Sequence, residues 1–371
     1  MKKLLLLIAL ITMSVTLSAQ TTKTMIWGGT QRQYMEYVPS TYDGSTPAPV
    51  IFTLHDVEGT MGDVFQSTNF QQIAEENGWI IISPQALPFS VVLFGTIPIT
   101  INGAWNAGIS AVIFGQYFVL NGNVDDSGFM MAILDNLIET YNINQDKIYF
   151  VGFSLGGYMT NRMAIEHSDR IKAIVSVNGP IGNEVENLTP AVPVSAMHIH
   201  GTNDPIVNYE TGTVSYSGFS FDIGKGAEET VEYWRSFDNC STTPEITYYP
   251  DIVDDGLTFE KYLYTDGTND TKVALIKVNG GQHEWYNGPD HDIDYTQEIY
   301  NFLTLGDVSI LLGDANDDGE INVSDIMAVI SYIYDNTPAT FNPVNADANG
   351  DGAINVIDVQ AIIYIIQSNL N

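Results

Sequence analysis

The stretch that most constrains this fold reads YFVGFSLGGY over residues 149–158. Its first residues are apolar, aromatic and β-branched, as in a buried strand, and apolar residues at helical spacing follow it. A strand, a sharp turn and a helix around Gly-x-Ser-x-Gly form a nucleophile elbow, whereas the bare pattern also arises by chance in turns. The glycines are needed because the turn is strained and the helix packs close to the strand. The stretch therefore predicts that Ser154 stands exposed at the carboxyl edge of a sheet.

Continuous apolar runs recur along the chain, at residues 49–55, 79–83, 148–151, 173–177, 192–200 and 273–278. Runs without polar alternation indicate strands that are buried on both faces. Helical patterns lie between them, at residues 70–77, 129–141, 158–167 and 227–237. Strands that alternate with helices predict an α/β fold with a mostly parallel sheet and helices on both of its faces.

Residues 86–121 interrupt this alternation with a long apolar segment that is rich in Gly and Pro. A loop of this length in a compact domain is usually functional or hides a further element. We expect an insertion that walls the site around Ser154, with a short helix or hairpin inside it. A structural excursion that packs on the core is the alternative.

The charge of the chain excludes one class of partner. Only 13 Lys and Arg oppose 45 Asp and Glu, and the formal net charge is −32. Nucleic-acid binding relies on clustered cations, so we expect no nucleic-acid partner. Carboxylate clusters can instead hold calcium.

The N-terminal residues predict export. Lys2 and Lys3 precede an apolar run at residues 4–11 and small residues at 18–19, which is the pattern of a secretory signal peptide over residues 1–19. The run is too short to span a membrane, and we expect no transmembrane segment elsewhere. The single cysteine, Cys240, cannot form an internal disulfide, and we expect a structural thiol. We therefore expect a secreted, extracellular protein, with attachment to a cell surface as a further option.

Acyl transfer by a serine requires a base and an orienting acid, and α/β-hydrolases carry them in the chain order Ser, Asp, His. His283 lies in a glycine-rich loop after the last apolar run, where this base belongs, and His291 is the second choice. Asp204 follows the run at 192–200 and can reach His283. The other acids and histidines fit less well, because they lie in later loops or within predicted elements: Asp222, Asp238, His55, His167, His198 and His200.

The oxyanion that forms on the substrate carbonyl requires two preorganised N–H donors. One should be the backbone N–H of Leu155, the residue after the nucleophile. The other should come from the loop after the run at 49–55, where Val57 is our choice and Asp56 the alternative. Trp105 and Trp285 are the expected aromatic residues of the substrate pocket.

Six short motifs resemble one known family. They are LH at 54–55, WNAG at 105–108, VDDSGF at 124–129, GFSLGG at 152–157, HGTNDP at 200–205 and GQHEW at 281–285. Together they look like the polyhydroxybutyrate-depolymerase-like and feruloyl esterases of carbohydrate esterase family one, over roughly residues 25–305. The resemblance implies an α/β-hydrolase fold, a Ser154–Asp204–His283 triad, and substrates that are ester-linked acids on plant polysaccharide or short polyesters.

Two departures from that family bear on the site. Asp56 follows His55 where the family usually has Gly, and a carboxylate near a developing oxyanion is unfavourable unless its side chain points away. Gln282 and Glu284 replace smaller residues beside His283, so the family's substrate preference does not transfer directly.

The C-terminal part contains an internal repeat. DANDDGEINVSD at residues 314–325 returns as DANGDGAINVID at residues 347–358, and no Lys or Arg occurs from Asp307 onward. Oxygen donors at loop positions 1, 3, 5 and 12, a carbonyl at 7 and Gly at 6 fit an EF-hand-type calcium loop. The expected ligands are Asp314, Asn316, Asp318, Glu320 and Asp325, and then Asp347, Asn349, Asp351, Ala353 and Asp358.

Each loop runs into a helical pattern, at residues 326–334 and 359–367, and residues 311–371 look like a type I dockerin. That resemblance implies a cohesin-type partner on a scaffold or cell surface. A calcium-stabilised terminal module without a partner is the alternative. The chain then divides into a signal peptide at 1–19, an esterase domain at 20–305 and a small all-α dockerin-like domain at 306–371.

These observations predict a secreted serine esterase that needs no cofactor for catalysis. The apolar insertion and the tryptophans favour feruloyl or related aryl esters on plant cell-wall polysaccharide. Acetyl removal from xylan and depolymerisation of polyhydroxyalkanoate are the alternatives within the enzymes. The alternative outside them is a catalytically weak polysaccharide-binding module that is carried by a dockerin.

Overall fold

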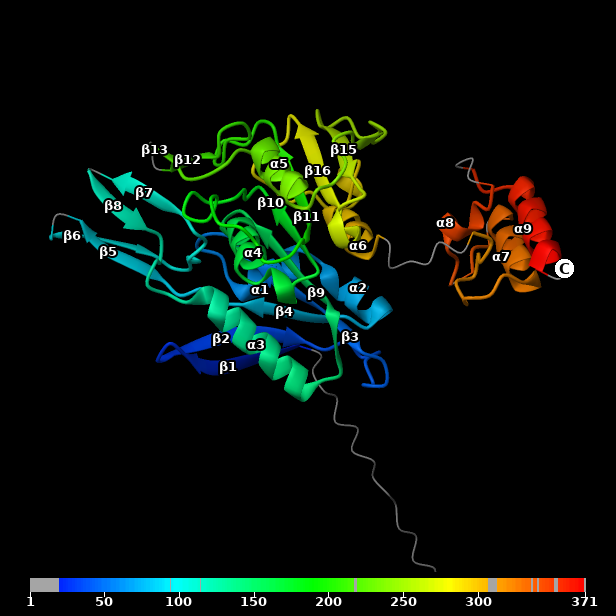
Figure 1. Ribbon diagram of the computed structural model, residues 1–371, viewed down its shortest axis with the longest axis horizontal. Coiled ribbons are helices and arrows are strands. Elements are labelled where there is room, and N and C mark those ends of the chain that lie inside the picture. The colour runs from blue at the N-terminus through cyan, green and yellow to red at the C-terminus, as the bar shows by residue number, and fades with distance from the viewer. Residues whose placement is uncertain are drawn as a thin grey trace, which may run out of the picture. The chain divides into compact units, whose positions relative to one another are not determined.

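The computed structural model describes residues 20–93, 95–113, 115–216, 219–305, 312–334, 336–338, 340–349 and 353–369. The predicted signal peptide lies outside these residues. The chain divides into two compact units between Leu303 and Thr304 (Figure 1). Among the described helices, none is long and apolar enough to cross a membrane.

A ten-stranded mixed sheet forms the frame of the first unit, in the order β1-β2-β4-β3-β9-β10-β11-β16-β15-β14. The central strands from β4 to β16 pair in parallel, and antiparallel pairs flank them on both sides. The strands are β1 (Gln20–Trp27), β2 (Thr30–Tyr37), β3 (Ala48–Leu54), β4 (Ile80–Pro84), β9 (Ile143–Phe153), β10 (Ala173–Val177), β11 (Ser195–Gly201), β14 (Glu245–Tyr248), β15 (Thr258–Tyr264) and β16 (Val273–Asn279).

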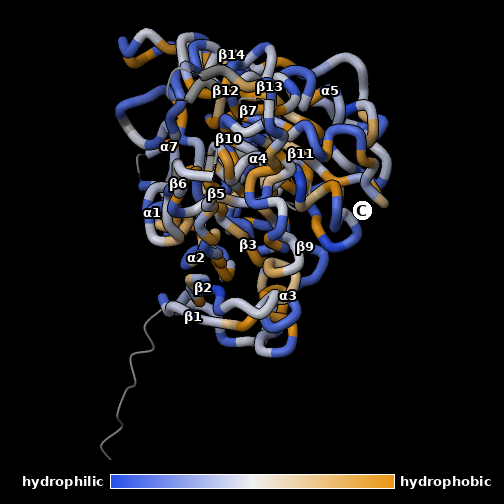
Figure 2. Tube along the Cα trace, turned by 90° about the vertical axis from the view of Figure 1, so that its left-hand side faces the viewer, coloured by the Kyte–Doolittle hydropathy of each residue, from blue (hydrophilic) through white to orange (hydrophobic). Residues whose placement is uncertain are grey.

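Successive residues of the central strands face opposite sides of this sheet, because the side-chain period of a strand is two. Phe52 of β3 lies in one apolar cluster with side chains of α3, α4 and α5. Its neighbour Ile51 lies in the other cluster, with side chains of α1, α2 and α6. Figure 2 shows hydrophobic segments gathered inside, along strands such as β3 and β10, and hydrophilic segments in many outer loops. The prediction of a mostly parallel sheet with helices on both faces is confirmed.

The helices of this unit are α1 (Met61–Ser67), α2 (Phe70–Asn77), α3 (Asp126–Thr140), α4 (Leu155–Glu166), α5 (Ala227–Phe237) and α6 (Tyr295–Thr304). Short 3₁₀ turns occur at Ser168–Arg170, Thr268–Asp270 and Gly288–Asp290. Sequence patterns did not predict α1, α6, β14 or β15. α1 spans only seven residues, and β14 is an edge strand whose residues are all exposed, so the patterns of these two elements are weak.

The insertion at residues 86–121 contains two β-hairpins that extend from the body of the unit (Figure 1). They consist of β5 (Phe89–Leu93) with β6 (Ile97–Ile101), and β7 (Ser110–Ile113) with β8 (Gln116–Val119). Another two-stranded sheet pairs β12 (Thr213–Tyr216) with β13 (Phe219–Asp222).

The second unit contains α7 (Val323–Ile333), α8 (Pro343–Ala346) and α9 (Val356–Asn369). Its small core gathers apolar side chains from both copies of the repeat, including Ala315, Val329 and Ile362. The helices follow the two repeated loops, as the sequence pattern predicts.

Candidate active site

Ser154 lies in a strained turn between β9 and α4. Its φ of 54° and ψ of −120° are costly for a residue that has a Cβ. The surrounding backbone is packed too tightly for side chains: a Cβ on Gly152 would lie 2.2 Å from the carbonyl oxygen of Gly156, and one on Gly179 would lie 2.1 Å from that of Ser154. The N–H of Ser154 donates to the Val177 carbonyl at 2.8 Å. The fold therefore holds the serine at the end of β9. The expectation that Ser154 stands exposed is wrong, because this tight packing leaves only 6% of the residue exposed.

The structure brings Ser154, His283 and Asp204 together. His283 Nε2 lies 2.9 Å from Ser154 Oγ, and His283 Nδ1 lies 2.6 Å from Asp204 Oδ2. Asp204 follows β11 and His283 follows β16, and these strands are parallel neighbours. Their loops are in close contact, since a Cβ on Gly201 would lie 2.4 Å from the carbonyl oxygen of Gly281. The arrangement has the geometry of a nucleophile, a base and an orienting acid.

The Asp204 carboxylate is fixed by several donors. Its Oδ1 accepts hydrogen bonds from the backbone N–H groups of Ile206 at 2.8 Å and Val207 at 2.9 Å. Burial alone raises the pKa of Asp204, but hydrogen bonds from His200 and His283 outweigh that effect, and the net pKa lies well below its usual range. An ionised carboxylate at this place orients the imidazole and stabilises its protonated form.

The start of α4 packs directly on the end of β3. A Cβ on Gly156 would lie 2.1 Å from the carbonyl oxygen of Leu54, so the two backbones touch beside the serine. Among the described residues, the backbone N–H groups of Leu155 and Val57 have no backbone hydrogen-bond acceptor, whereas the N–H of Asp56 interacts with its own carboxylate. Such N–H groups at a helix start and in the facing loop can bind an oxyanion. Val57 therefore fits the second donor better than the alternative Asp56, whose own carboxylate competes for its N–H.

His55 anchors the loop that carries these donors. It is 1% exposed, and its Nε2 accepts a hydrogen bond from the Ala86 N–H at 3.0 Å. Its Nδ1 therefore carries the proton and donates to the Asp56 carbonyl at 2.7 Å. Burial lowers the pKa of His55 to about 4, so the ring is neutral at physiological pH.

Trp105 has a different place from the one expected. We predicted a substrate-pocket residue, but Trp105 is 0% exposed, and its Nε1 donates to the His55 carbonyl at 2.8 Å. A fully buried indole has no surface to offer to a substrate. Its ring instead packs against His55 at 4.7 Å between centroids and supports the loop.

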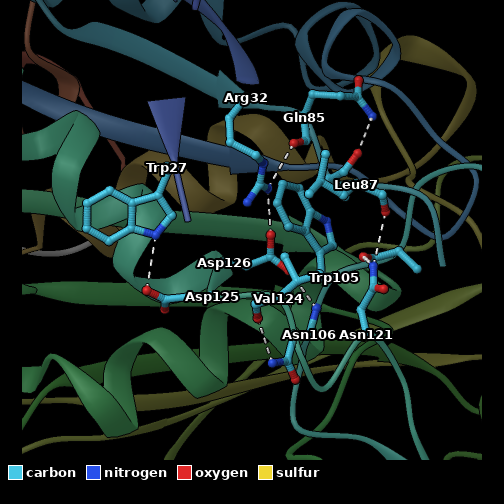
Figure 3. Close-up of polar contacts among 12 residues, drawn as sticks. Trp27, Arg32, Gln85, Leu87, Trp105, Asn106, Asn121, Val124, Asp125 and Asp126 are labelled. Carbon is cyan, nitrogen blue, oxygen red and sulfur yellow. Dashed lines mark hydrogen bonds and ion pairs between the residues drawn. The ribbon is translucent and has the colours of Figure 1, made fainter. Parts of the chain in front are cut away.

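A buried ion pair joins Arg32 to Asp126 (Figure 3). Arg32 donates to Asp126 Oδ1 at 2.6 Å and to the Gln85 carbonyl at 3.2 Å. The other carboxylate oxygen of Asp126 accepts the Asn106 N–H at 2.7 Å. Gln85 Nε2 lies 3.1 Å from His55 Nε2. Through Asn106 and Gln85, the ion pair thus connects the WNAG and VDDSGF motifs to His55 and the loop that follows it.

The Asp56 side chain lies over Gly59, since a Cβ on Gly59 would be 2.1 Å from Asp56 Oδ1. The carboxylate is half-buried, and burial raises its pKa, while the positive charge that His283 can carry lowers it. Asp56, the residue that departs from the family pattern, therefore has its carboxylate packed against its own loop.

The remaining expected residues lie as follows. Trp285 is half-buried, donates to Asn287 Oδ1 at 2.9 Å and packs on Tyr295. His291, the second choice for the base, pairs with Asp255 at 2.8 Å, whereas His283 is the histidine that contacts Ser154.

Sequence reasoning set His198 and His200 aside as strand residues, and it did not indicate the polar contacts around Asp204 and His283. His198, His200 and Ser176 lie buried behind Asp204, and the Tyr286 hydroxyl accepts the Gln282 N–H at 2.8 Å beside His283. Histidines in an otherwise apolar strand were the only signal for the first group.

The two repeated loops of the second unit share one hydrogen-bond pattern. Asp325 accepts the N–H groups of Asn316 at 3.1 Å and Asn322 at 2.8 Å. Asp358 accepts those of Asn349 at 3.2 Å and Asn355 at 2.8 Å. The expected ligand Asp351 lies outside the described residues.

The acidic end residues of these loops are buried: Asp314 is 2% exposed, and Asp325 and Asp358 are 0% exposed. Glu320 and Ala353 are exposed, as loop positions that offer a carbonyl can be, while Asp318 and Asn349 are exposed and Asp347 is half-buried. Among the described residues, no group of three or more His, Cys, Asp or Glu side chains is gathered for a metal ion.

Two family models match parts of the chain. Residues 125–232 match the phospholipase/carboxylesterase model, and residues 312–367 match the dockerin type I domain. The bifunctional acetylxylan esterase/xylanase XynS20E of Neocallimastix patriciarum is 24% identical over 279 residues, which cover 74% of this chain and 33% of that protein. Feruloyl esterase C of Emericella nidulans is 25% identical over 218 residues, which cover 57% of this chain and 72% of that protein.

An acetyl xylan esterase structure from Aspergillus awamori is also similar, with a TM-score of 0.49 and 14% identity over 76% of this chain and 98% of that one. The chain spans about a third to a half of the length of two curated relatives that it matches. The chain thus joins an α/β-hydrolase domain, which has feruloyl and acetylxylan esterase homologues, to a C-terminal dockerin type I domain.

Proposed function

We propose that this protein is a serine esterase. The observation that carries the proposal is the hydrogen-bond chain from Ser154 through His283 to Asp204, with distances of 2.9 and 2.6 Å. The N–H groups of Leu155 and Val57, which have no acceptor among the described residues, support it as the candidate oxyanion hole. This combination supplies every part that acyl transfer by serine requires.

In the proposed reaction, His283 Nε2 removes the Ser154 hydroxyl proton as Oγ attacks the ester carbonyl. The tetrahedral oxyanion is held by the backbone N–H groups of Leu155 and Val57. His283 then protonates the leaving alcohol, which is a sugar hydroxyl for a polysaccharide ester. Water, activated by the same histidine, hydrolyses the acyl-enzyme and releases the acid, while Asp204 stabilises the imidazolium in both steps.

The substrate we propose is a feruloyl or related aryl ester on plant cell-wall polysaccharide. Relatives of this chain include enzymes named feruloyl esterase. Trp285, a half-buried residue two positions after His283 in the sequence, supports an aromatic acyl group. Deacetylation of xylan is the second candidate, because another relative is named an acetylxylan esterase/xylanase.

A panel of esters tests both the activity and the acyl group. Release of ferulate from methyl ferulate and from feruloylated arabinoxylan, and of acetate from acetylated xylan, should be measured with the wild type and with Ser154→Ala. We expect the wild type to favour the feruloyl esters and Ser154→Ala to fall to background. Ser45→Ala, in an exposed turn, is the control that should keep full activity. Equal background rates for wild type and Ser154→Ala would contradict the esterase proposal.

We further propose that the two repeated loops bind calcium. Three acidic side chains, Asp314, Asp325 and Asp358, are buried in a segment whose sequence has no Lys or Arg, so no cationic side chain of that segment can balance them. Calcium takes such oxygen ligands, and bound ions would draw the carboxylates of each loop together. The ions would be structural and would take no part in ester hydrolysis.

The same unit supports a proposal about location. A dockerin type I domain fits attachment to a cohesin-bearing scaffold, and cell-wall polysaccharide is an extracellular substrate. We propose that the protein is secreted with the help of the signal peptide at residues 1–19 and acts outside the cell, on a scaffold.

A further inference from the structure

A row of buried polar side chains lies behind the candidate triad, on the neighbouring strands β10 and β11. Ser176, His198 and His200 are 1%, 2% and 0% exposed. Ser176 Oγ lies 2.7 Å from His198 Nδ1, and His198 Nε2 lies 3.0 Å from His200 Nδ1. Burying two imidazoles in a central strand is costly unless every polar atom is paired.

The hydrogen bonds determine which nitrogen carries each proton. His200 Nε2 lies 3.0 Å from the Val207 carbonyl, which can only accept, so this nitrogen carries the proton. With this one proton on His200, its Nδ1 accepts from His198 Nε2–H, and His198 Nδ1 accepts from the Ser176 hydroxyl. Burial, and then the neighbouring His200, lower the pKa of His198 well below its usual value, which agrees with a neutral ring.

The row ends at the candidate acid. His200 Nε2 also lies 3.4 Å from Asp204 Oδ2, the oxygen that accepts from His283 Nδ1. Val207, whose carbonyl accepts the hydrogen bond from His200 Nε2–H, donates its own N–H to Asp204 Oδ1 at 2.9 Å. One N–H group of His200 therefore contacts both the carboxylate and the loop that holds it.

We propose that His200 is a positioning residue for ester hydrolysis: its Nε2–H, oriented by His198 and Ser176, holds the Asp204 carboxylate where Oδ2 accepts the hydrogen bond from His283 Nδ1–H. The inference rests on the proposed esterase function. His200 touches neither the substrate nor Ser154 and acts only through Asp204. A carboxylate that turns within its loop would leave His283 free to adopt the wrong tautomer or orientation.

Three substitutions at His200 test whether this position must supply an N–H donor or only a side chain that fills the space. Gln places its amide N–H near the position of imidazole Nε2, whereas Asn places it near that of Nδ1, and Met fills the space without any donor. We expect His200→Gln to keep kcat within about threefold of the wild type. We expect His200→Asn and His200→Met to lower kcat by about 10- to 100-fold with KM nearly unchanged, because only the alignment of the catalytic groups is lost.

The measurements are kcat and KM on a p-nitrophenyl ester, the rate of labelling by a fluorophosphonate probe, and the melting temperature of each variant. Met is the second variant if the Asn variant does not fold: it is apolar and of similar size, and its melting temperature shows whether the core tolerates the His198 N–H that it leaves unpaired. Equal kcat values for Gln and Met, or a Met variant that is stable and fully active, would overturn the proposal.

Failure of the proposed function would look different from failure of this inference. If wild type and Ser154→Ala are equally inert toward both ester and probe, the esterase function fails. If the wild type is active and the Gln, Asn and Met variants are equally active, the esterase function stands and the positioning role of His200 fails.

Discussion

At the scale of single residues, groups that are costly in free energy lie where neighbouring residues reduce that cost. Ser154 takes a strained backbone conformation that its glycine neighbours permit, and His55 stays neutral because burial lowers its pKa to about 4. Asp238 differs from both. It is 0% exposed, and its Oδ2 has no hydrogen-bond partner among the described residues.

Asp238 makes stability depend on pH. Burial raises the pKa of Asp238 to about 7, although a hydrogen bond from the Val194 N–H opposes this rise. An unfolded Asp titrates near pH ~4. Between about pH 4 and pH 7 the folded state holds a proton that the unfolded state has released, so stability falls as pH rises through this window.

We therefore predict that Asp238→Asn stabilises the first unit at pH 8 by roughly 2 to 4 kcal/mol and has little effect near pH 4.5. Asn stays neutral and keeps the oxygen that accepts from Val194. The measurement is the free energy of unfolding in urea at both pH values. The exposed Asp146→Asn is the matched control. An Asp238→Asn effect that is equal at both pH values would refute the pH-dependent penalty.

At the scale of elements, the contact between the start of α4 and the end of β3 builds the candidate oxyanion site. Gly156 is the second residue of α4, and a Cβ there would meet the Leu54 and His55 carbonyl oxygens at 2.1 and 2.8 Å. Gly62 is the second residue of α1, and a Cβ there would meet only side-chain atoms at 3.7 Å or more. The two glycines thus form a matched pair.

We predict that Gly156→Ala destabilises the first unit by about 1–3 kcal/mol or more and abolishes ester hydrolysis, because backbone atoms cannot move aside. Gly62→Ala should leave activity intact and should stabilise the protein by roughly 0.5–1 kcal/mol, since Ala is the better helix former. Melting temperature and ester turnover of the two variants provide the comparison. An active, stable Gly156→Ala protein would show that this contact does not shape the site.

At the scale of the whole molecule, the two units depend on different conditions. The first has large apolar clusters on both faces of its sheet, whereas the second has a small core next to buried acidic residues. We predict that a calcium chelator lowers the melting temperature of the second unit and leaves that of the first unchanged. A ligand that binds only the folded state stabilises it by mass action.

Differential scanning calorimetry of the full chain, with excess calcium and with chelator, measures both transitions. The rate of ester hydrolysis in the same samples should not change. Asp325→Ala should mimic the chelator, and Met327→Ala, at an exposed position of α7 outside the expected ligand set, should not. Unfolding transitions whose temperatures are the same with calcium and with chelator would count against the proposed metal sites.

The sequence by itself determined the parts that depend on local pattern. Apolar runs indicated the central strands because strands buried on both faces cannot alternate, and the elbow motif located Ser154. The spacing of the repeat located the two loops. Chain order and loop type selected Asp204 and His283, and the structure places both within hydrogen-bond distance along the triad.

Only the tertiary structure decided the residues whose roles depend on distant neighbours. Trp105 was expected in the substrate pocket. It is instead buried against His55, a contact between segments 50 residues apart in sequence. The role proposed for His198 and His200 depends on their contacts with Asp204 in the next loop and with Ser176 on the neighbouring strand. Local patterns encode which element a residue joins, whereas the direction of a side chain and its partners are decided when the sheet brings remote strands together.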